Sequence, residues 1–200
     1  RPLFQDIEAE EVVTEDNRRK AVMALKSAVT AYQKTKVLDI QPLKKVLREL
    51  VVEIIRHRDS MIHQLDMRTY QDYIYSHSVN TCVLSVLIAV NMDYPEAKLT
   101  DLALGTMLHD IGMMMLPDAL LLKMGNLTPE ESKQVQQHPE DGFNILQTVR
   151  EIPITVAHIA YQHHERVDGK GYPRNLTADK ILEFAKVAAV ADTFDALVSD

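Results

Sequence analysis

The sequence predicts an all-α fold, and three observations support this class. The 200 residues include only six glycines, and no run of useful length alternates β-branched with polar residues as strands do. Apolar residues recur at spacings of three and four instead, and several segments open with typical helix start signals. With 46% hydrophobic residues, the chain can bury the core of about one domain.

The first part of the chain predicts a linker and two helices. Residues 1–15 are acidic and irregular, so we expect a linker there, followed by a helix from Asn17 to about Lys36. The next helix begins near Pro42, which a first helical turn tolerates. It carries a heptad-like stripe with one charged member: Leu47, Val51, Ile54, Arg58, Met61 and Leu65. Fewer than four heptads are present, so a bundle helix explains the stripe better than a coiled coil, which stays the alternative.

The rest of the chain predicts further helices and one long loop. A capping box at Thr128–Glu131, with proline after the cap, marks one helix start. The other expected elements, in order, are helices at about 70–92, from a Thr100 cap to about Gly112, at 117–123, at 153–164 and at 181–197, with a loop rich in glycine and proline at 165–178.

Charge, hydropathy and cysteine content exclude several classes of protein. The chain has 22 basic and 29 acidic residues, a net charge of −7, which argues against a binder of DNA or RNA polymers. The most apolar stretch, 81–91, is too short to cross a bilayer, so we expect no transmembrane segment in this chain. A single cysteine, Cys82, fits a reducing compartment such as the cytoplasm.

Histidines and aspartates form a regularly spaced set: His77, His109, Asp110, His138, His163, His164 and Asp192. Gaps of 25 to 32 residues place successive members on different helices of a bundle, which is how bundles build metal sites. Imidazole binds iron, manganese, zinc and nickel, and a carboxylate can bridge two ions. Seven ligands suffice for two ions that share Asp110, a pair that can stabilise a phosphoryl transition state. A lone helical histidine is usually structural, and we assign His57, His63 and His158 to that class.

Two motifs carry a family resemblance. His109-Asp110 lies in HDIG, and HHERVDGKGYP runs from His163 to Pro173; together they resemble the HD-GYP branch of the HD-domain metallophosphohydrolases. The segments LPDALLLKMGNLTPEE, HPEDGFNIL and VAAVADTFDALVSD fit the same pattern in the same order, so the resemblance covers about 70–200. It implies an HD-type helical bundle whose long loop carries the GYP motif.

The resemblance also implies a division of the chain. Residues 67–200 would form the HD-GYP metallophosphohydrolase domain. This domain would be incomplete at its C-terminal end, because the family continues into an Arg-Pro-Tyr segment that helps to hold phosphate. Residues 1–66 would be the linker and leading helices of a truncated N-terminal regulatory region.

The function implied by the resemblance is a bacterial, cytoplasmic phosphodiesterase that hydrolyses cyclic di-GMP to pGpG and/or GMP through a metal-bridging hydroxide. Its cofactors would be two divalent ions, iron or manganese, with zinc, nickel or magnesium as alternatives. Asp110 and His109 would be the catalytic residues. His77, His109, Asp110 and Asp192 would hold one ion, and His138, His163 and His164 the other, with Asp110 bridging.

The implied role of Gly171, Tyr172 and Pro173 is contact with the substrate or with diguanylate-cyclase (GGDEF) domains; a rigid turn is the plainer interpretation. The heptad-like stripe adds a homodimer as a further expectation.

Two positions depart from the family pattern. Met113 stands where the family usually has a lysine near the substrate phosphate, and the loss of one such donor costs on the order of 10²–10³ in rate. Tyr73 stands where members with a third metal carry a glutamate, so we expect two metals. Three hypotheses stay open: an active cyclic di-GMP phosphodiesterase, a degenerate member that binds a nucleotide or a partner protein, and a hydrolase of another cyclic dinucleotide.

Overall fold

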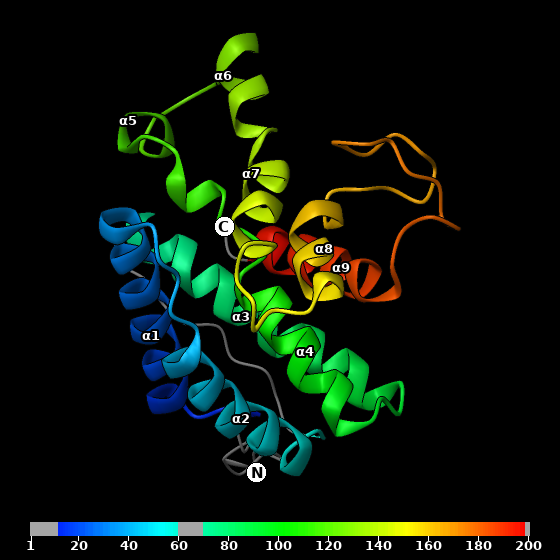
Figure 1. Ribbon diagram of the computed structural model, residues 1–200. Coiled ribbons are helices and arrows are strands. Elements are labelled where there is room, and N and C mark those ends of the chain that lie inside the picture. The colour runs from blue at the N-terminus through cyan, green and yellow to red at the C-terminus, as the bar shows by residue number, and fades with distance from the viewer. Residues whose placement is uncertain (1–11, 60–69, 199–200) are drawn as a thin grey trace, which may run out of the picture.

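The computed structural model describes residues 12–59 and 70–198, and within these ranges it contains helices and no strand, which confirms the all-α class (Figure 1). The elements are α1 (Glu15–Thr35), α2 (Gln41–Arg56), α3 (Tyr70–Asn91), α4 (Glu96–Met107), a 3₁₀ turn η1 (Met113–Met115), α5 (Asp118–Leu121), α6 (Pro129–Val135), α7 (His138–Leu146), α8 (Ile154–Gln162) and α9 (Glu183–Val198).

Helix α3 is the centre of the bundle. It packs against α1, α2, α4 and α9, and every residue from 76 to 86 is buried. Figure 1 shows α1 and α2 on one side of α3, and α8 and α9 on the other. A helix that is covered on all sides has no distinct polar face, because no face of it meets water, and α3 buries polar side chains such as Ser78 and Thr81 among its apolar ones.

The length of this apolar helix corrects the expectation that the most apolar stretch of the chain is too short to cross a bilayer. The apolar segment extends over Tyr73–Asn91, 19 residues, which by length and composition alone could cross a membrane. Since 83% of this stretch is buried inside the fold, we interpret α3 as the core helix of the bundle.

The first two helices share the core of the bundle. Leu47, Val51 and Ile54 of the stripe are buried in the same cluster as the apolar residues of α3 and α4, as expected for a bundle helix. Met61 and Leu65 lie outside the described residues, as does the predicted domain boundary between 66 and 67. Within the predicted linker, Val12 and Val13 are fully buried in this core.

Two helix boundaries differ from the expectation. Helix α4 begins at Glu96 after Pro95, and Thr100 lies inside it, where its hydroxyl donates to the carbonyl of Glu96. A threonine hydroxyl that finds a carbonyl one turn earlier no longer acts as a cap. The same helix ends at Met107, before Gly112, and leads into turns and η1.

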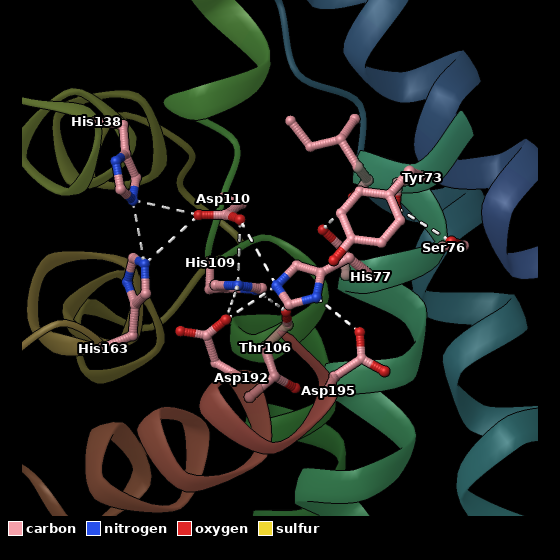
Figure 2. A network of polar contacts seen from close by, with 12 residues as sticks. Tyr73, Ser76, His77, Thr106, His109, Asp110, His138, His163, Asp192 and Asp195 are labelled. Carbon is pink, nitrogen blue, oxygen red and sulfur yellow. Dashed lines mark hydrogen bonds and ion pairs between the residues drawn. The ribbon is translucent and has the colours of Figure 1, made fainter. Parts of the chain in front are cut away.

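The capping box at Thr128 is present, with both of its reciprocal hydrogen bonds. The helix that it starts is short, because the chain turns after Val135 and a second helix, α7, opens at His138. This turn directs the His138 side chain toward the ends of α4 and α8 (Figure 2).

Candidate metal centre

The seven side chains that the sequence singles out gather at one place between the helices. His77 comes from the middle of α3, His109 and Asp110 from the turn after α4, and His138 from the first residue of α7. His163 and His164 follow α8, and Asp192 lies on α9. They form two groups, each with ligand atoms within 4.8 Å of one another: His77, His109 and Asp192; and Asp110, His138, His163 and His164.

Asp110 lies between the two groups (Figure 2). Its Oδ1 is 3.2 Å from His138 Nε2 and 3.5 Å from His163 Nε2. Its Oδ2 faces the other way, 3.4 Å from His109 Nε2 and 4.0 Å from His77 Nε2. One carboxylate therefore presents a separate oxygen to each group, which is the arrangement that a bridging ligand requires.

Three of the imidazole rings are oriented by the backbone. In each, Nδ1 lies within hydrogen-bonding distance of the carbonyl three residues earlier: His109 to Thr106 at 2.6 Å, His138 to Val135 at 2.7 Å and His163 to Ala160 at 2.8 Å. Only a protonated Nδ1 can donate to a carbonyl, so we assign the proton to Nδ1 in all three rings. The Nε2 lone pairs then point into the centre, ready to bind a metal.

The Nε2 atoms of His109, His138 and His163 are placed so that they can bind cations. His109 is fully buried, and its Nε2 has no hydrogen-bond partner among the described residues. His138 Nε2 and His163 Nε2 lie 3.2 Å apart, so two lone pairs face each other. Buried polar atoms in such positions are costly unless something binds them, and a divalent ion satisfies both cases. The donor sets of nitrogen and carboxylate oxygen suit iron and manganese.

His77 has a partner that sequence reasoning missed. Its Nε2 lies 2.9 Å from Asp192 Oδ1, and its Nδ1 lies 2.7 Å from Oδ2 of Asp195 (Figure 2). Asp195 is fully buried and belongs to neither ligand group. The signal was available, because residues three apart on a helix share a face and Asp195 follows Asp192 by three.

The electrostatics of the centre follow from these contacts. Burial alone would lower the pKa of His77, but its hydrogen bonds with Asp192 and Asp195 outweigh burial and raise the pKa to about 10. Burial also favours the neutral acid at Asp110, yet the facing imidazoles outweigh it and hold the pKa of Asp110 well below its usual value. At His164, burial and the neighbouring imidazoles lower the pKa to about 2, which keeps this ring in the neutral, metal-binding form.

The GYP motif packs on the turn that carries the candidate ligands His163 and His164. Gly171 lies so close to this turn that a Cβ atom would come within 2.5 Å of the His164 carbonyl oxygen and 2.3 Å of the Arg166 nitrogen. The Tyr172 ring stacks on the His164 ring, with centroids 4.7 Å apart and planes 25° apart. The motif therefore packs against the candidate ligand His164, and its contacts with substrate stay a prediction.

The same loop is anchored by Glu165. Its carboxylate is buried and accepts hydrogen bonds from the backbone nitrogens of Arg174, at 2.7 Å, and Leu176, at 2.8 Å. The residue that follows the two histidines therefore ties down the far side of the GYP motif.

The structure shows the surroundings of the two residues that depart from the family pattern. Met113 is half-buried and packs against the core. Two lysines that follow in the chain could supply a positive charge in its place: Lys123 is paired with Glu131 at 2.5 Å, and Lys170 is exposed on the loop. Tyr73 stacks near His77, with centroids 6.0 Å apart. His158 packs beside Phe143, outside both ligand groups, as a structural histidine does.

Comparisons with known proteins support a family assignment. A family model described as HD domain matches residues 49–200. The chain is 34% identical to a cyclic di-GMP phosphodiesterase of Pseudomonas aeruginosa over 82% of this chain and 39% of the relative. It is 38% identical to one of Thermotoga maritima, over 76% of this chain and 40% of the relative. A 3'3'-cGAMP-specific phosphodiesterase of Vibrio cholerae is 35% identical over 64% of this chain and 28% of the relative.

The fold also matches a solved structure. An HDG"Y"P protein from Bdellovibrio bacteriovorus superposes with a TM-score of 0.66 at 21% identity, over 92% of this chain and 58% of that one. The chain spans about two fifths of the length of the first two relatives, so their activities do not transfer to it directly. The family model, the relatives and the shared fold agree with the HDIG and GYP motifs, and the chain belongs to the HD-GYP family of HD-domain proteins.

Proposed function

We propose that this protein is a metal-dependent phosphodiesterase that hydrolyses cyclic di-GMP to pGpG, with GMP as a further product. The observation that carries this proposal is the position of Asp110, whose two oxygens face two separate ligand groups. A centre of this kind suits phosphoryl transfer, and relatives that match most of this chain are named cyclic di-GMP phosphodiesterases.

The residues of the centre would hold two divalent ions, with iron or manganese favoured by the donor sets. A pair of divalent ions, when bound, supplies a hydroxide nucleophile and neutralises the charge that develops on the phosphate. The chain contributes pre-orientation: His109, His138 and His163 are locked by backbone carbonyls with Nε2 facing inward. Because Asp110 stays ionised at neutral pH, it can serve both groups at once.

A second substrate, 3'3'-cGAMP, is favoured by one observation: relatives with 35% and 43% identity are named 3'3'-cGAMP-specific phosphodiesterases. Both substrates contain the same phosphodiester chemistry, and the ligand groups do not read the base. The direct test offers both nucleotides to the same preparation.

The remaining proposals concern context. We place the protein in the bacterial cytoplasm, which suits its buried free cysteine, Cys82. A contact of the GYP loop with GGDEF domains and a homodimer are further predictions. For the homodimer, Leu47, Val51 and Ile54 of the stripe pack within the chain, and among the described members of the stripe only Arg58 is exposed.

The test is hydrolysis by protein loaded anaerobically with Fe²⁺ or Mn²⁺, with products separated by chromatography. We expect pGpG or GMP from cyclic di-GMP, and no product from Asp110→Ala. Asp16→Ala is the matched control, because Asp16 is exposed on α1 and belongs to neither ligand group. Two bound metals per chain without any product from either nucleotide would contradict the proposal and favour a degenerate member that only binds.

Met113→Lys tests the departure from the family pattern in the same assay. If the missing positive charge limits turnover, this variant should raise the rate of hydrolysis by about 10²-fold. An unchanged rate would show that the missing charge does not limit the reaction.

A further inference from the structure

Asp195 is a buried carboxylate that the proposed chemistry does not use. It is fully buried on α9, one helical turn after Asp192. Its Oδ2 lies 2.7 Å from Nδ1 of His77, while Asp192 Oδ1 lies 2.9 Å from Nε2 of the same ring (Figure 2). Two aspartates on one face of α9 therefore hold the two nitrogens of one imidazole on α3.

The position of His77 explains why a carboxylate is needed there. His109 and His163 follow the ends of α4 and α8, and His138 follows the end of α6. The last carbonyls of a helix have no partner within the helix, so they are free to accept the Nδ1–H of these rings. His77 lies in the middle of α3, where the carbonyls accept the hydrogen bonds of the helix itself. An acceptor for its Nδ1 must come from another element, and α9 provides Asp195.

We propose that Asp195 is a positioning residue that holds His77 with the proton on Nδ1 and the Nε2 lone pair turned toward the ion shared with His109 and Asp192. The inference rests on the metal centre of the proposed function. A carboxylate behind a ligating histidine fixes the ring and makes the facing nitrogen a stronger donor. Its removal typically lowers metal affinity 10- to 100-fold.

The asymmetry of the centre makes the expected effect selective. Asp195 contacts a ligand of the group His77, His109 and Asp192, whereas the group around His138 and His163 is oriented by backbone carbonyls that no side-chain change removes. Asp195→Ala should therefore weaken one of the two bound ions about 10- to 100-fold and leave the other at wild-type affinity.

The first experiment is Mn²⁺ binding to the whole chain by equilibrium dialysis with EPR detection of free Mn²⁺. Wild type is expected to bind two ions, and Asp195→Ala one tightly and one weakly. Asp195→Asn keeps an oxygen that accepts the Nδ1–H, so it should restore most of the affinity. Asp16→Asn and Asp16→Ala are matched controls on an exposed carboxylate of α1 and should bind as wild type does. Circular dichroism of each variant checks the helical fold.

The second experiment reads the proton directly. In Zn²⁺-loaded protein, long-range ¹H–¹⁵N correlation spectra should show His77 protonated at Nδ1 in wild type and in Asp195→Asn. Equal, tight binding of both Mn²⁺ ions by Asp195→Ala, or a His77 proton on Nε2 in wild type, would overturn the proposal. If Asp195→Ala does not fold, Asp195→Leu and the isosteric Asp195→Asn take its place. Wild-type affinity for both ions in Asp195→Leu, or loss of the second ion in Asp195→Asn, would overturn the proposal. Metal binding and ring protonation are measured without substrate, so they test the role of Asp195 even if the hydrolysis assay shows no product. A wild type that binds no ion would refute both the role of Asp195 and the proposed function.

Discussion

Gly112, the last residue of HDIG, makes the approach of α7 to the metal centre possible. Its backbone is in the ordinary right-handed helical region, so an alanine there would suffer no conformational strain. A Cβ atom, however, would lie 2.1 Å from the carbonyl oxygen of His138 and 2.7 Å from the nitrogen of Gly142. Both are backbone atoms of α7, so no side-chain rotation can relieve the contact.

Gly112→Ala should consequently displace His138. Cβ contacts below 3.0 Å are essentially never seen, so the start of α7 must move by about 0.9 Å. That movement is large against the 3.2 Å that separate His138 Nε2 from Asp110 Oδ1. A misplacement of about 1 Å costs on the order of 10²-fold in rate, and overpacking costs about 1–3 kcal/mol of stability.

The assay compares Gly112→Ala with Gly105→Ala. At Gly105 the added Cβ meets the end of the flexible Ile159 side chain, at 2.2 Å, which can turn aside. We expect urea unfolding to show some loss of stability in both variants. Only Gly112→Ala should lose Mn²⁺ from the group around His138, and only its rate of hydrolysis should fall, by about 10²-fold. Wild-type metal binding and turnover in Gly112→Ala would refute the reasoning, because α7 would then yield without moving its ligand.

Three further outcomes follow from the contacts. Gly171→Ala should separate Tyr172 from His164, since its Cβ would clash with the backbone of 164–166, and equilibrium dialysis should show metal affinity lowered about 10-fold. Gly125→Ala is the control: its positive φ of 94° strains an alanine, but the added Cβ meets nothing within 4 Å, so metal affinity should stay at the wild-type value. In chelator-treated protein, protonated His77 stabilises the fold fully below the pKa of 6.5 that it has in the unfolded chain, and this stability is lost as the pH rises through about 10. The urea midpoint should therefore fall between these two pH values. His77→Gln should make the urea midpoint nearly independent of pH over the same range. Adding back Mn²⁺ at 100 times its dissociation constant should stabilise the fold by about 2.7 kcal/mol per site, and an unshifted melting curve would argue against metal binding.

Local patterns in the sequence were enough to predict the class of fold and to single out the seven side chains that the structure brings together. Helix starts such as the Thr128 capping box depend on residues three apart, so they can be read directly. The seven candidate ligands could be recognised in the sequence for a similar reason, because they lie in short motifs whose regular spacing places the motifs on different helices. By distance, Asp110 falls into the group of His138, His163 and His164, and the division of these residues between two ions stays a prediction.

Tertiary structure decided what depends on contacts between distant segments. The spacing of three places Asp195 on the same face of α9 as Asp192, but its contact with His77, 118 residues away in the chain, forms only when α9 packs on α3. The start of α4 at Glu96 and that of α7 at His138 coincide with prolines, Pro95 and Pro139, which are local signals. A sequence displays which side chains can bind a metal, whereas the partners that orient them lie on other helices and are fixed only when the core closes.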